Sequence, residues 1–271
     1  MNLTGTIESA ERQFRQILEE FFISIYNEKS LPSHGIDHHR RVWKNAKDIL
    51  RICYPSKNIP SDFVTRLMIA CYLHDIGMSI DPGFRHGIHS RDLTVKFLTD
   101  SRLNSQDFGD LLDTIENHDN KDYSGERNVN DLLTVLSVAD DLEAFGYTGI
   151  YRYSEIYLTR NIAPKILGEK IIENAEKRFN HFKATYGEYP ELFVKHQDRY
   201  QILTGFFSEY NKQAVSYEFN SIDPKGYCGV IELFIKMNKD KTGLSDIIKE
   251  QTRFKNDEVI SWFLTGLKSE I

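Results

Sequence analysis

The sequence predicts an all-α fold, made of one large helical domain and a C-terminal helical extension. Apolar residues recur every three to four positions along most of the 271 residues, which is the period of an amphipathic helix. The apolar–polar alternation typical of a half-buried strand is almost absent. Hydrophobic residues make up 40% of the chain and charged residues 27%, so a core of ordinary size can form.

The first part of the chain, up to the polar loop NHDNKDYSGERN, carries a regular helical pattern. Its apolar spacing predicts helices over 7–27, 37–53, 61–77, 89–98 and 105–118. Asp37 is a candidate N-cap of the second helix, and Ser61 or Asp62 of the third. Gly77 suits a left-handed cap at the end of the third helix.

The part of the chain after this loop carries the same regular helical pattern. Its apolar spacing predicts helices over 130–145, 151–158, 165–185, 190–213, 229–237, 244–251 and 257–269. Gly146 and Gly149 mark a bend between the first two of these helices. The segment 214–227 contains the turn signal DPKG and could hold a short extended piece.

Charge and composition exclude several classes of function. The net charge of −6 argues against binding to a nucleic-acid polymer, which needs a basic surface. Three scattered cysteines favour no disulfide framework and fit a reducing cytoplasm. No apolar run is long enough to span a membrane, and the first residues do not resemble a secretory signal. We therefore expect a cytoplasmic protein.

Four polar side chains stand on core-facing stripes near helix ends. They are His38, His74, Asp75 and Asp140, and the central pair closes the apolar run RLMIACYLHDIG. A buried carboxylate without a partner costs several kcal/mol, so such groups are paired or bound to a metal. Each residue alone can be an ordinary hydrogen-bonded core residue or a helix cap. Together they indicate a divalent cation, and mixed imidazole and carboxylate ligands suit Mn, Fe, Co, Ni, Mg or Zn.

This ordered set resembles the HD superfamily of metal-dependent phosphohydrolases. HGIDHHRRVWKNA and ADDLEAFGYTGIYR are similar to two segments of a bacterial subfamily of small HD hydrolases, and FVKHQDRYQILTGFF to its closing helix. The likeness covers roughly residues 10–212. It implies an HD-domain helical bundle over 1–213 that holds one metal through the four residues above. Residues 214–271 would form a C-terminal extension of unknown role.

Two further histidines decide between one metal ion and two. His86 and His118 stand where bimetallic HD proteins are expected to have additional ligands. They would otherwise contact the phosphate of a substrate or water.

Two departures from the subfamily leave the substrate open: Asp141 stands where its members have arginine, and Met78 replaces the lysine of the cyclic-dinucleotide branch.

The resemblance implies hydrolysis of a phosphate ester or anhydride in a nucleotide or similar small molecule. Asp75 would act in catalysis as a ligand, His34 would contact the substrate or orient a ligand, and Asp141 and Glu143 are candidates for proton transfer. The candidates for binding the substrate are Arg41, Lys44, Arg152, His86 and His118.

Two alternatives stay open at this point. Some HD proteins with this ligand order are di-iron oxygenases, which iron content and O2 uptake would distinguish from a hydrolase. A non-catalytic nucleotide sensor is the third hypothesis, and Asp141 beside the metal keeps it open. The exact substrate and the oligomeric state, including a homodimer, are not determined by the sequence.

Overall fold

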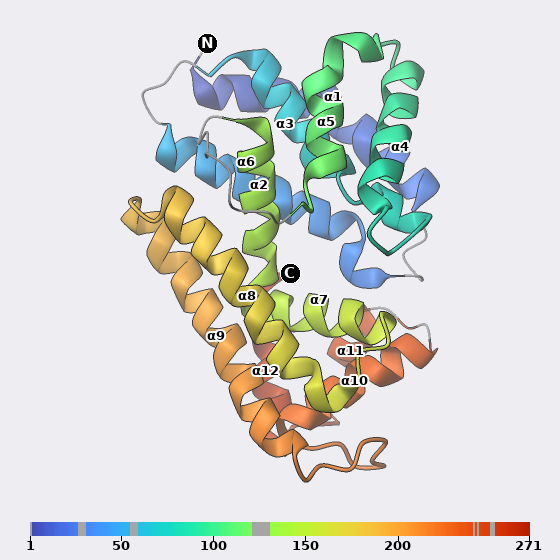
Figure 1. Cartoon of the computed structure of the whole chain (residues 1–271), viewed down its shortest axis with the longest axis vertical. Helices are drawn as coiled ribbons and strands as arrows, with labels where there is room; N and C mark the ends of the chain where they lie inside the picture. Colours follow the sequence, from blue (N-terminus) through green and yellow to red (C-terminus); the bar gives the residue numbers. More distant parts are fainter. Residues whose placement is uncertain are drawn as a thin grey trace. The chain divides into compact units, whose positions relative to one another are not determined.

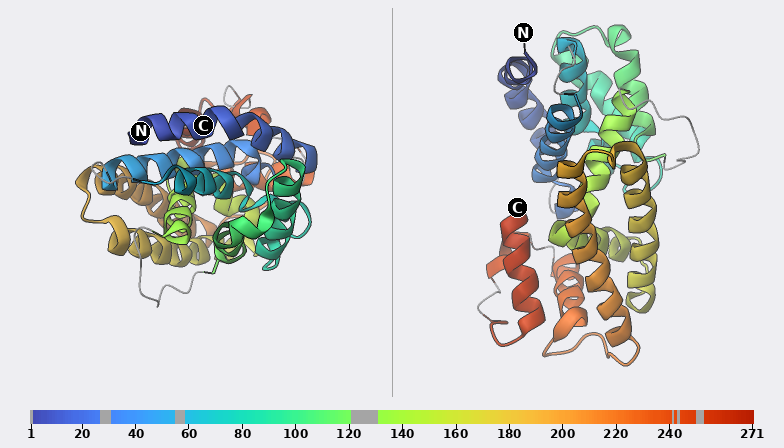
Figure 2. Two further views of the ribbon diagram at one scale, coloured as in Figure 1. Left: turned by 90° about the horizontal axis from the view of Figure 1, so that it is seen from above. Right: turned by 90° about the vertical axis from the view of Figure 1, so that its left-hand side faces the viewer.

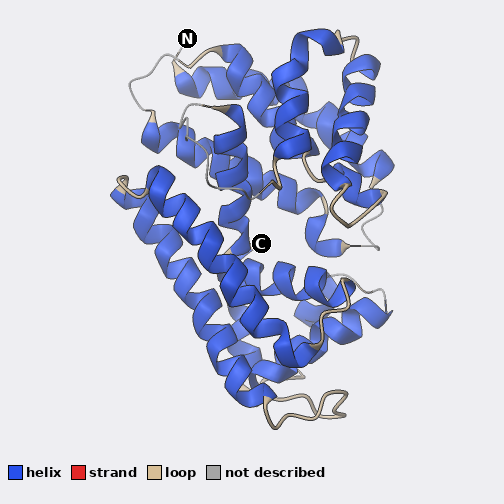
Figure 3. Ribbon diagram, in the orientation of Figure 1, coloured by secondary structure: helices blue, strands red, loops and turns tan. Residues whose placement is uncertain are grey.

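The computed structural model describes residues 2–26, 31–54, 59–120, 131–240, 242, 244–249 and 253–271. Every regular element among these residues is a helix, and none of them forms a strand (Figure 3). The predicted all-α fold is confirmed, and the short extended piece expected within 214–227 is not present. No helix in the described part of the chain is long and apolar enough to cross a membrane.

The helices follow the predicted order closely (Figure 1). The α-helices are α1 (Leu3–Ile25), α2 (Ile36–Cys53), α3 (Ser61–Leu73), α4 (His86–Asp100), α5 (Gly109–Asn117), α6 (Leu132–Asp141), α7 (Gly146–Thr159), α8 (Pro164–Tyr186), α9 (Pro190–Ala214), α10 (Gly226–Asp240), α11 (Leu244–Lys249) and α12 (Glu258–Glu270). Short 3₁₀ turns are η1 (Pro32–His34), η2 (Ile76–Ser79), η3 (Ser105–Phe108) and η4 (Leu142–Ala144). Most of the predicted loop NHDNKDYSGERN, from residue 121 on, lies outside the described residues.

The chain divides into two compact units. The first comprises residues 1–27, 34–142 and 181–193, and the second comprises 28–33, 143–180 and 194–271. The second unit thus groups the predicted extension with residues that precede it in the chain. The boundary predicted at 213/214 stays a prediction.

Helix α3 forms the centre of the first unit. It packs against α1, α2 and α6, and Figure 2 shows α1, α2 and α3 side by side. Its residues Val64, Leu67, Met68 and Cys71 are fully buried. A helix that is apolar on nearly all sides needs neighbours on all sides. The apolar run that precedes His74 is therefore the core of this unit.

Several helix ends differ from the predictions. Gly35, not Asp37, is the N-cap of α2, and Asp37 lies in the first turn, where its Oδ1 accepts a hydrogen bond from Arg40 at 2.8 Å. Helix α3 begins at Ser61 but ends at Leu73, with His74 as its C-cap. Gly77 lies in η2 and has no positive φ, so the left-handed cap predicted there is wrong.

Helix α7 organises the second unit. It packs against α10 and α12, which also pack against each other. Helices α8 and α9 meet through the stacked rings of Phe179 and Tyr200, whose centroids are 4.2 Å apart. The bend predicted at Gly146 and Gly149 is confirmed for Gly146, which begins α7 with a φ of +71°, whereas Gly149 lies inside α7 and marks no bend.

Candidate metal centre

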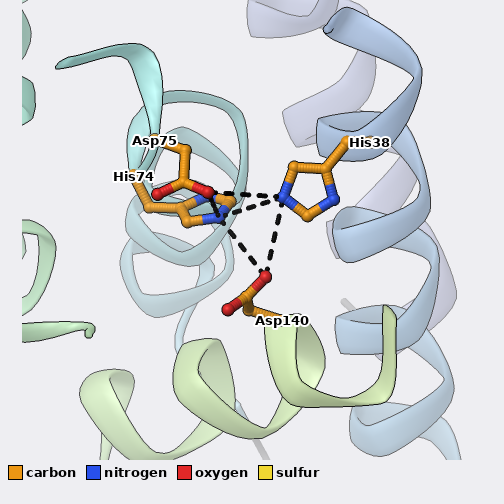
Figure 4. A group of neighbouring side chains, drawn as sticks. All are labelled: His38, His74, Asp75 and Asp140. Atoms are coloured by element: carbon orange, nitrogen blue, oxygen red, sulfur yellow. Dashed lines mark hydrogen bonds and ion pairs between the residues drawn. The ribbon is translucent and has the colours of Figure 1, made fainter. Parts of the chain in front are cut away.

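Four buried side chains converge from three helices of the first unit (Figure 4). His38 lies in the first turn of α2, His74 and Asp75 follow the last residue of α3, and Asp140 lies near the end of α6. None of the four residues is more than 5% exposed. The predicted convergence of these side chains is what the structure shows.

The distances between their ligand atoms suit a single cation. His38 Nε2 lies 3.3 Å from His74 Nε2, 3.7 Å from Asp75 Oδ2 and 3.6 Å from Asp140 Oδ1. His74 Nε2 lies 3.4 Å from Asp75 Oδ2 and 3.8 Å from Asp140 Oδ1. Two ligand atoms that are each about 2.1 Å from one ion are about 3.0–4.2 Å apart, depending on the angle between them. The group therefore fits one ion without rearrangement of the backbone.

A second group of possible ligands shares Asp75 with the first. His118 Nε2 lies 3.0 Å and His86 Nε2 lies 3.4 Å from Asp75 Oδ1, and both rings are buried. Asp75 thus presents Oδ2 to His38 and His74, and Oδ1 to His86 and His118. A carboxylate that divides its oxygens in this way can bridge two cations.

Backbone carbonyls determine which nitrogen of three of these imidazoles, those of His74, His86 and His118, faces the group. The Nδ1 atom of His74 donates to the Cys71 carbonyl at 3.1 Å. The Nδ1 atoms of His86 and His118 lie 2.6 Å and 2.7 Å from the carbonyls of Gly83 and Ile115. A carbonyl can only accept, so Nδ1 carries the hydrogen and Nε2 of a neutral ring offers a lone pair. This is the arrangement in which histidine binds a metal through Nε2.

Those lone pairs would face the oxygens of Asp75 and Asp140. In the absence of a cation, a proton is needed between each lone pair and the oxygens that it faces. The pKa values of the group agree with this requirement. Burial by itself would lower the pKa of His74, but the carboxylates of Asp75 and Asp140 outweigh it and raise the pKa to about 9. Burial would raise the pKa of Asp75, yet His74, His118 and His38 hold it well below its usual value. The group thus attracts positive charge, as a cation site must.

Two glycines allow the helices that carry these ligands to approach closely. A Cβ atom on Gly77 would lie 2.2 Å from the His86 carbonyl oxygen, and one on Gly87 would lie 2.4 Å from that of Glu116. The amide of Gly77 also donates to Ser90 Oγ at 2.8 Å. The N-terminus of α4 therefore lies directly on η2 and on α5. This close packing brings His86 toward Asp75 and His118.

The remaining predicted residues of the first unit lie in varied surroundings. His34 is buried, and its ring centroid is 5.5 Å from that of His38. Arg41 is half-buried and Lys44 is exposed. Asp141 is buried, and its Oδ2 lies 3.3 Å from His181 Nδ1.

Glu143 and Arg152 belong to the second unit and are both buried there. Neither residue is a member of the two ligand groups. Their predicted roles in proton transfer and substrate binding stay predictions.

The buried histidines that sequence reasoning missed include His39 and His181. His39 Nδ1 lies 3.1 Å from the Cys71 carbonyl, which also accepts from His74, and the two rings are 4.9 Å apart. The sequence doublet HH at 38–39 was the signal from which His39 could have been found, because both residues lie in the first turn of α2. His181 carried no signal, since its partner Asp141 is 40 residues away.

Fold and site together define a helical protein with a buried histidine–aspartate group that has the spacing of metal ligands. The family model of the HD domain matches residues 35–144, a range that includes all six possible ligands. The chain therefore contains an HD domain, the defining domain of a superfamily of metal-dependent hydrolases. Comparison with curated proteins and with solved structures returned no match. The expected relation to the HD superfamily is confirmed, and the likeness to one bacterial subfamily stays a prediction.

Proposed function

We propose that this protein is a metal-dependent phosphohydrolase that acts on a nucleotide or another small phosphate ester or anhydride. The observation that carries the proposal is the buried group of His38, His74, Asp75 and Asp140, which lies within the HD domain and has ligand spacing. A divalent cation held there would polarise a phosphoryl oxygen and lower the pKa of a nearby water.

The ligand set supports Mn, Fe, Co, Ni, Mg or Zn. We propose that His86 and His118 complete a second site with Asp75. The two groups are buried and share one carboxylate, which supports two ions rather than one. Hydrogen bonds from Nδ1 to backbone carbonyls hold the rings of His74, His86 and His118 in the tautomer that binds a metal through Nε2, before any ion is bound. This reduces the reorganisation needed on binding.

The substrate's negative charge requires cations from the protein as well. We propose Arg41, Lys44 and Arg152 for this role, since phosphoryl transfer depends on positioning and on charge stabilisation. His34, whose ring lies beside that of His38, would orient this ligand or contact the substrate. Asp141 and Glu143 are proposed as proton-transfer groups. The contact of Asp141 with His181 supports this role, because the two together can hold one proton in a buried place.

A di-iron oxygenase is the second candidate. The shared carboxylate of Asp75 between two histidine-containing groups also suits a pair of iron ions. Protein purified with iron would then consume O2 in the presence of its substrate. A phosphohydrolase would release phosphate or pyrophosphate without any uptake of O2.

The deciding experiment combines metal analysis with a phosphate-release screen across nucleotides. We expect at least one divalent ion per chain and release of phosphate or pyrophosphate from at least one compound. His74→Ala and Asp140→Ala should abolish phosphate release and lower the metal content by at least one ion per chain, whereas His89→Ala, on the same helix as His86 but outside both groups, should retain both. Full metal content and turnover in a folded His74→Ala variant would refute the proposed site.

A further inference from the structure

The turn before α4 is tied to a candidate ligand. In the segment SIDPGFRH, the amide of Gly83 donates to Asp81 Oδ1 at 2.8 Å. The carbonyl of the same glycine accepts from His86 Nδ1 at 2.6 Å. The backbone of this turn is therefore coupled to the ring that faces Asp75.

The same turn places a large apolar side chain in water. Phe84 is 97% exposed, and Ile80 and Ile88, four residues away on either side, are 59% and 42% exposed. A phenyl ring buries about 150–250 Å² when it finds a partner, so leaving it in solvent forgoes a large stabilisation. Three exposed apolar side chains within nine residues of chain, next to a candidate ligand, are typical of a binding surface.

The side chain of Arg85, the next residue, is exposed and makes no hydrogen bond or ion pair with the described part of the chain, whereas its backbone carbonyl accepts from the amide of His89 at 3.2 Å. By contrast, Arg40, Arg66 and Arg91 in the same unit are each bound to a carboxylate. A free guanidinium has the planar geometry that suits a phosphate group.

Phe84 and Arg85 stand immediately before the candidate ligand His86 in the chain. Two residues of extended chain span at most about 7 Å, which limits the distance between the Cα atoms of Phe84 and His86. Cations held by the ligand set would offset the charge of Asp75 and Asp140, while Asp119 Oδ2, 3.9 Å from His86 Nε2, adds a negative charge beside it. The phosphates of a polyphosphate that do not contact these cations need a positive group outside the ligand set, and Arg85, the residue before His86, supplies one.

We propose that Phe84 and Arg85 form a recognition element for a nucleoside polyphosphate. Phe84 stacks on the base, and Arg85 binds a phosphate that does not react. This inference rests on the proposed function and narrows its substrate class to compounds that carry an aromatic base.

The test compares two probes on the full, metal-loaded chain. They are a panel of the four common ribonucleoside triphosphates and inorganic tripolyphosphate, which lacks a base. Stacking on an aromatic side chain is worth enough that Phe84→Ala should raise KM for the nucleotide by about 5- to 100-fold. The KM for tripolyphosphate should not change, and Phe84→Trp should retain nucleotide binding. Arg85→Ala should raise KM for both probes, and Arg85→Lys should restore part of the loss.

Ile222→Ala is the matched control, because Ile222 is 96% exposed and belongs to the second unit. Equal losses for both probes in Phe84→Ala, or no loss for either, would overturn the inference. So would a change from dimer to monomer in Phe84→Ala with unchanged KM, since the ring would then serve a contact between copies of the chain.

Failure of the proposed function is separable from failure of this inference. If the wild-type chain hydrolyses neither probe, calorimetric binding of the intact nucleotides replaces KM as the readout. Binding that Phe84→Ala weakens supports the recognition element in the absence of hydrolysis. No nucleotide binding by the wild-type chain overturns it.

Discussion

At the scale of single residues, the positions of the histidines follow from helix ends. The last carbonyls of an α-helix have no partner within the helix. Cys71 and Ile115 lie in the last turns of α3 and α5, so their carbonyls can accept from His74 and His118, three residues later. This explains why a core helix ends in a histidine: the helix end supplies the acceptor that orients the ring.

His86→Ala should distinguish one metal ion from two. The variant keeps the first group intact, so we expect bound metal to fall by about one ion per chain at saturating metal. Mass-spectrometric metal analysis after equilibrium dialysis is the measurement. His89→Ala, which removes a half-buried histidine from the same helix, should keep the wild-type content. Unchanged metal in His86→Ala would mean that the second group holds no ion.

At the scale of elements, contacts between helices determine how side chains on different helices lie relative to one another. The pattern of a single helix does not determine this. Gly77 and Gly87 are required by the approach of α4 to η2 and α5. Their neighbours are backbone carbonyls, which cannot move aside as a flexible side chain can. The position of His86 relative to Asp75 and His118 thus depends on the lack of a side chain at Gly77 and Gly87.

Gly87→Ala tests this dependence. The added Cβ would lie 2.4 Å from the Glu116 carbonyl oxygen, so α4 and α5 must separate. We expect a loss of about 1–3 kcal/mol in the free energy of unfolding, as for other overpacked sites, and loss of the second metal. Gly109→Ala on α5, where nothing lies within 4 Å, should be neutral or slightly stabilising. Urea unfolding and metal analysis measure both effects, and a stable Gly87→Ala variant with full metal content would contradict the argument.

A carboxylate shared by three helices gives the first unit a pH dependence. Glu19 on α1 accepts from Arg40 on α2 at 3.1 Å, from Arg15 at 3.1 Å and from Tyr72 on α3 at 3.2 Å. The bond from Arg40 is the largest favourable cause, and the pKa of Glu19 falls from 4.5 to about 2. A depressed pKa stabilises the fold above the unfolded value of 4.5, and this contribution is lost as the pH falls through about 2.

Glu19→Gln should therefore destabilise the protein at pH 7 and not at pH 2. Because the pair is partly open to solvent, we expect about 1 kcal/mol at pH 7. Glu20→Gln, on the exposed side of the same helix, should have almost no effect. Urea unfolding at several pH values gives the difference between the variants. A difference that does not shrink below pH 4 would assign the effect to packing instead of charge.

At the scale of the whole molecule, sequence reasoning succeeded where the signal was local. Helical periodicity is a local property, so most helices were predicted to within a few residues. The possible ligands were predicted because each lies on an apolar stripe and because their order resembles a known family. The cap of α2 at Gly35, the role of Gly77 and the pairing of Asp141 with His181 were missed. Each of these depends on residues distant in sequence or on backbone geometry, which no local pattern encodes.

The division into two units separates the ligands from the C-terminal residues. All six possible ligands lie between residues 38 and 140, in the first unit. Residues 214–271 all lie in the second unit. This supports the proposal that the C-terminal extension is not part of the metal-binding core.

Glu270 provides a direct test of that separation. Its Oε2 accepts from the amide and the hydroxyl of Thr148 at 2.8 Å and 2.6 Å, and its Oε1 accepts from Arg199 Nε at 3.3 Å. It thereby satisfies a free amide in the first turn of α7, immediately after the positive φ of Gly146. Glu270→Ala leaves these donors without their acceptor, which costs about 1–3 kcal/mol when such groups are buried.

We expect thermal unfolding of Glu270→Ala to begin at a lower temperature, because the second unit is weakened, whereas metal content stays at the wild-type value. Two units need not unfold in one step, so calorimetry that resolves separate transitions is the appropriate measurement. Lys268→Ala, an exposed substitution two residues away on α12, should change neither quantity. Loss of metal from folded Glu270→Ala would show that the extension supports the ligands, and residues 214–271 would then belong to the catalytic core.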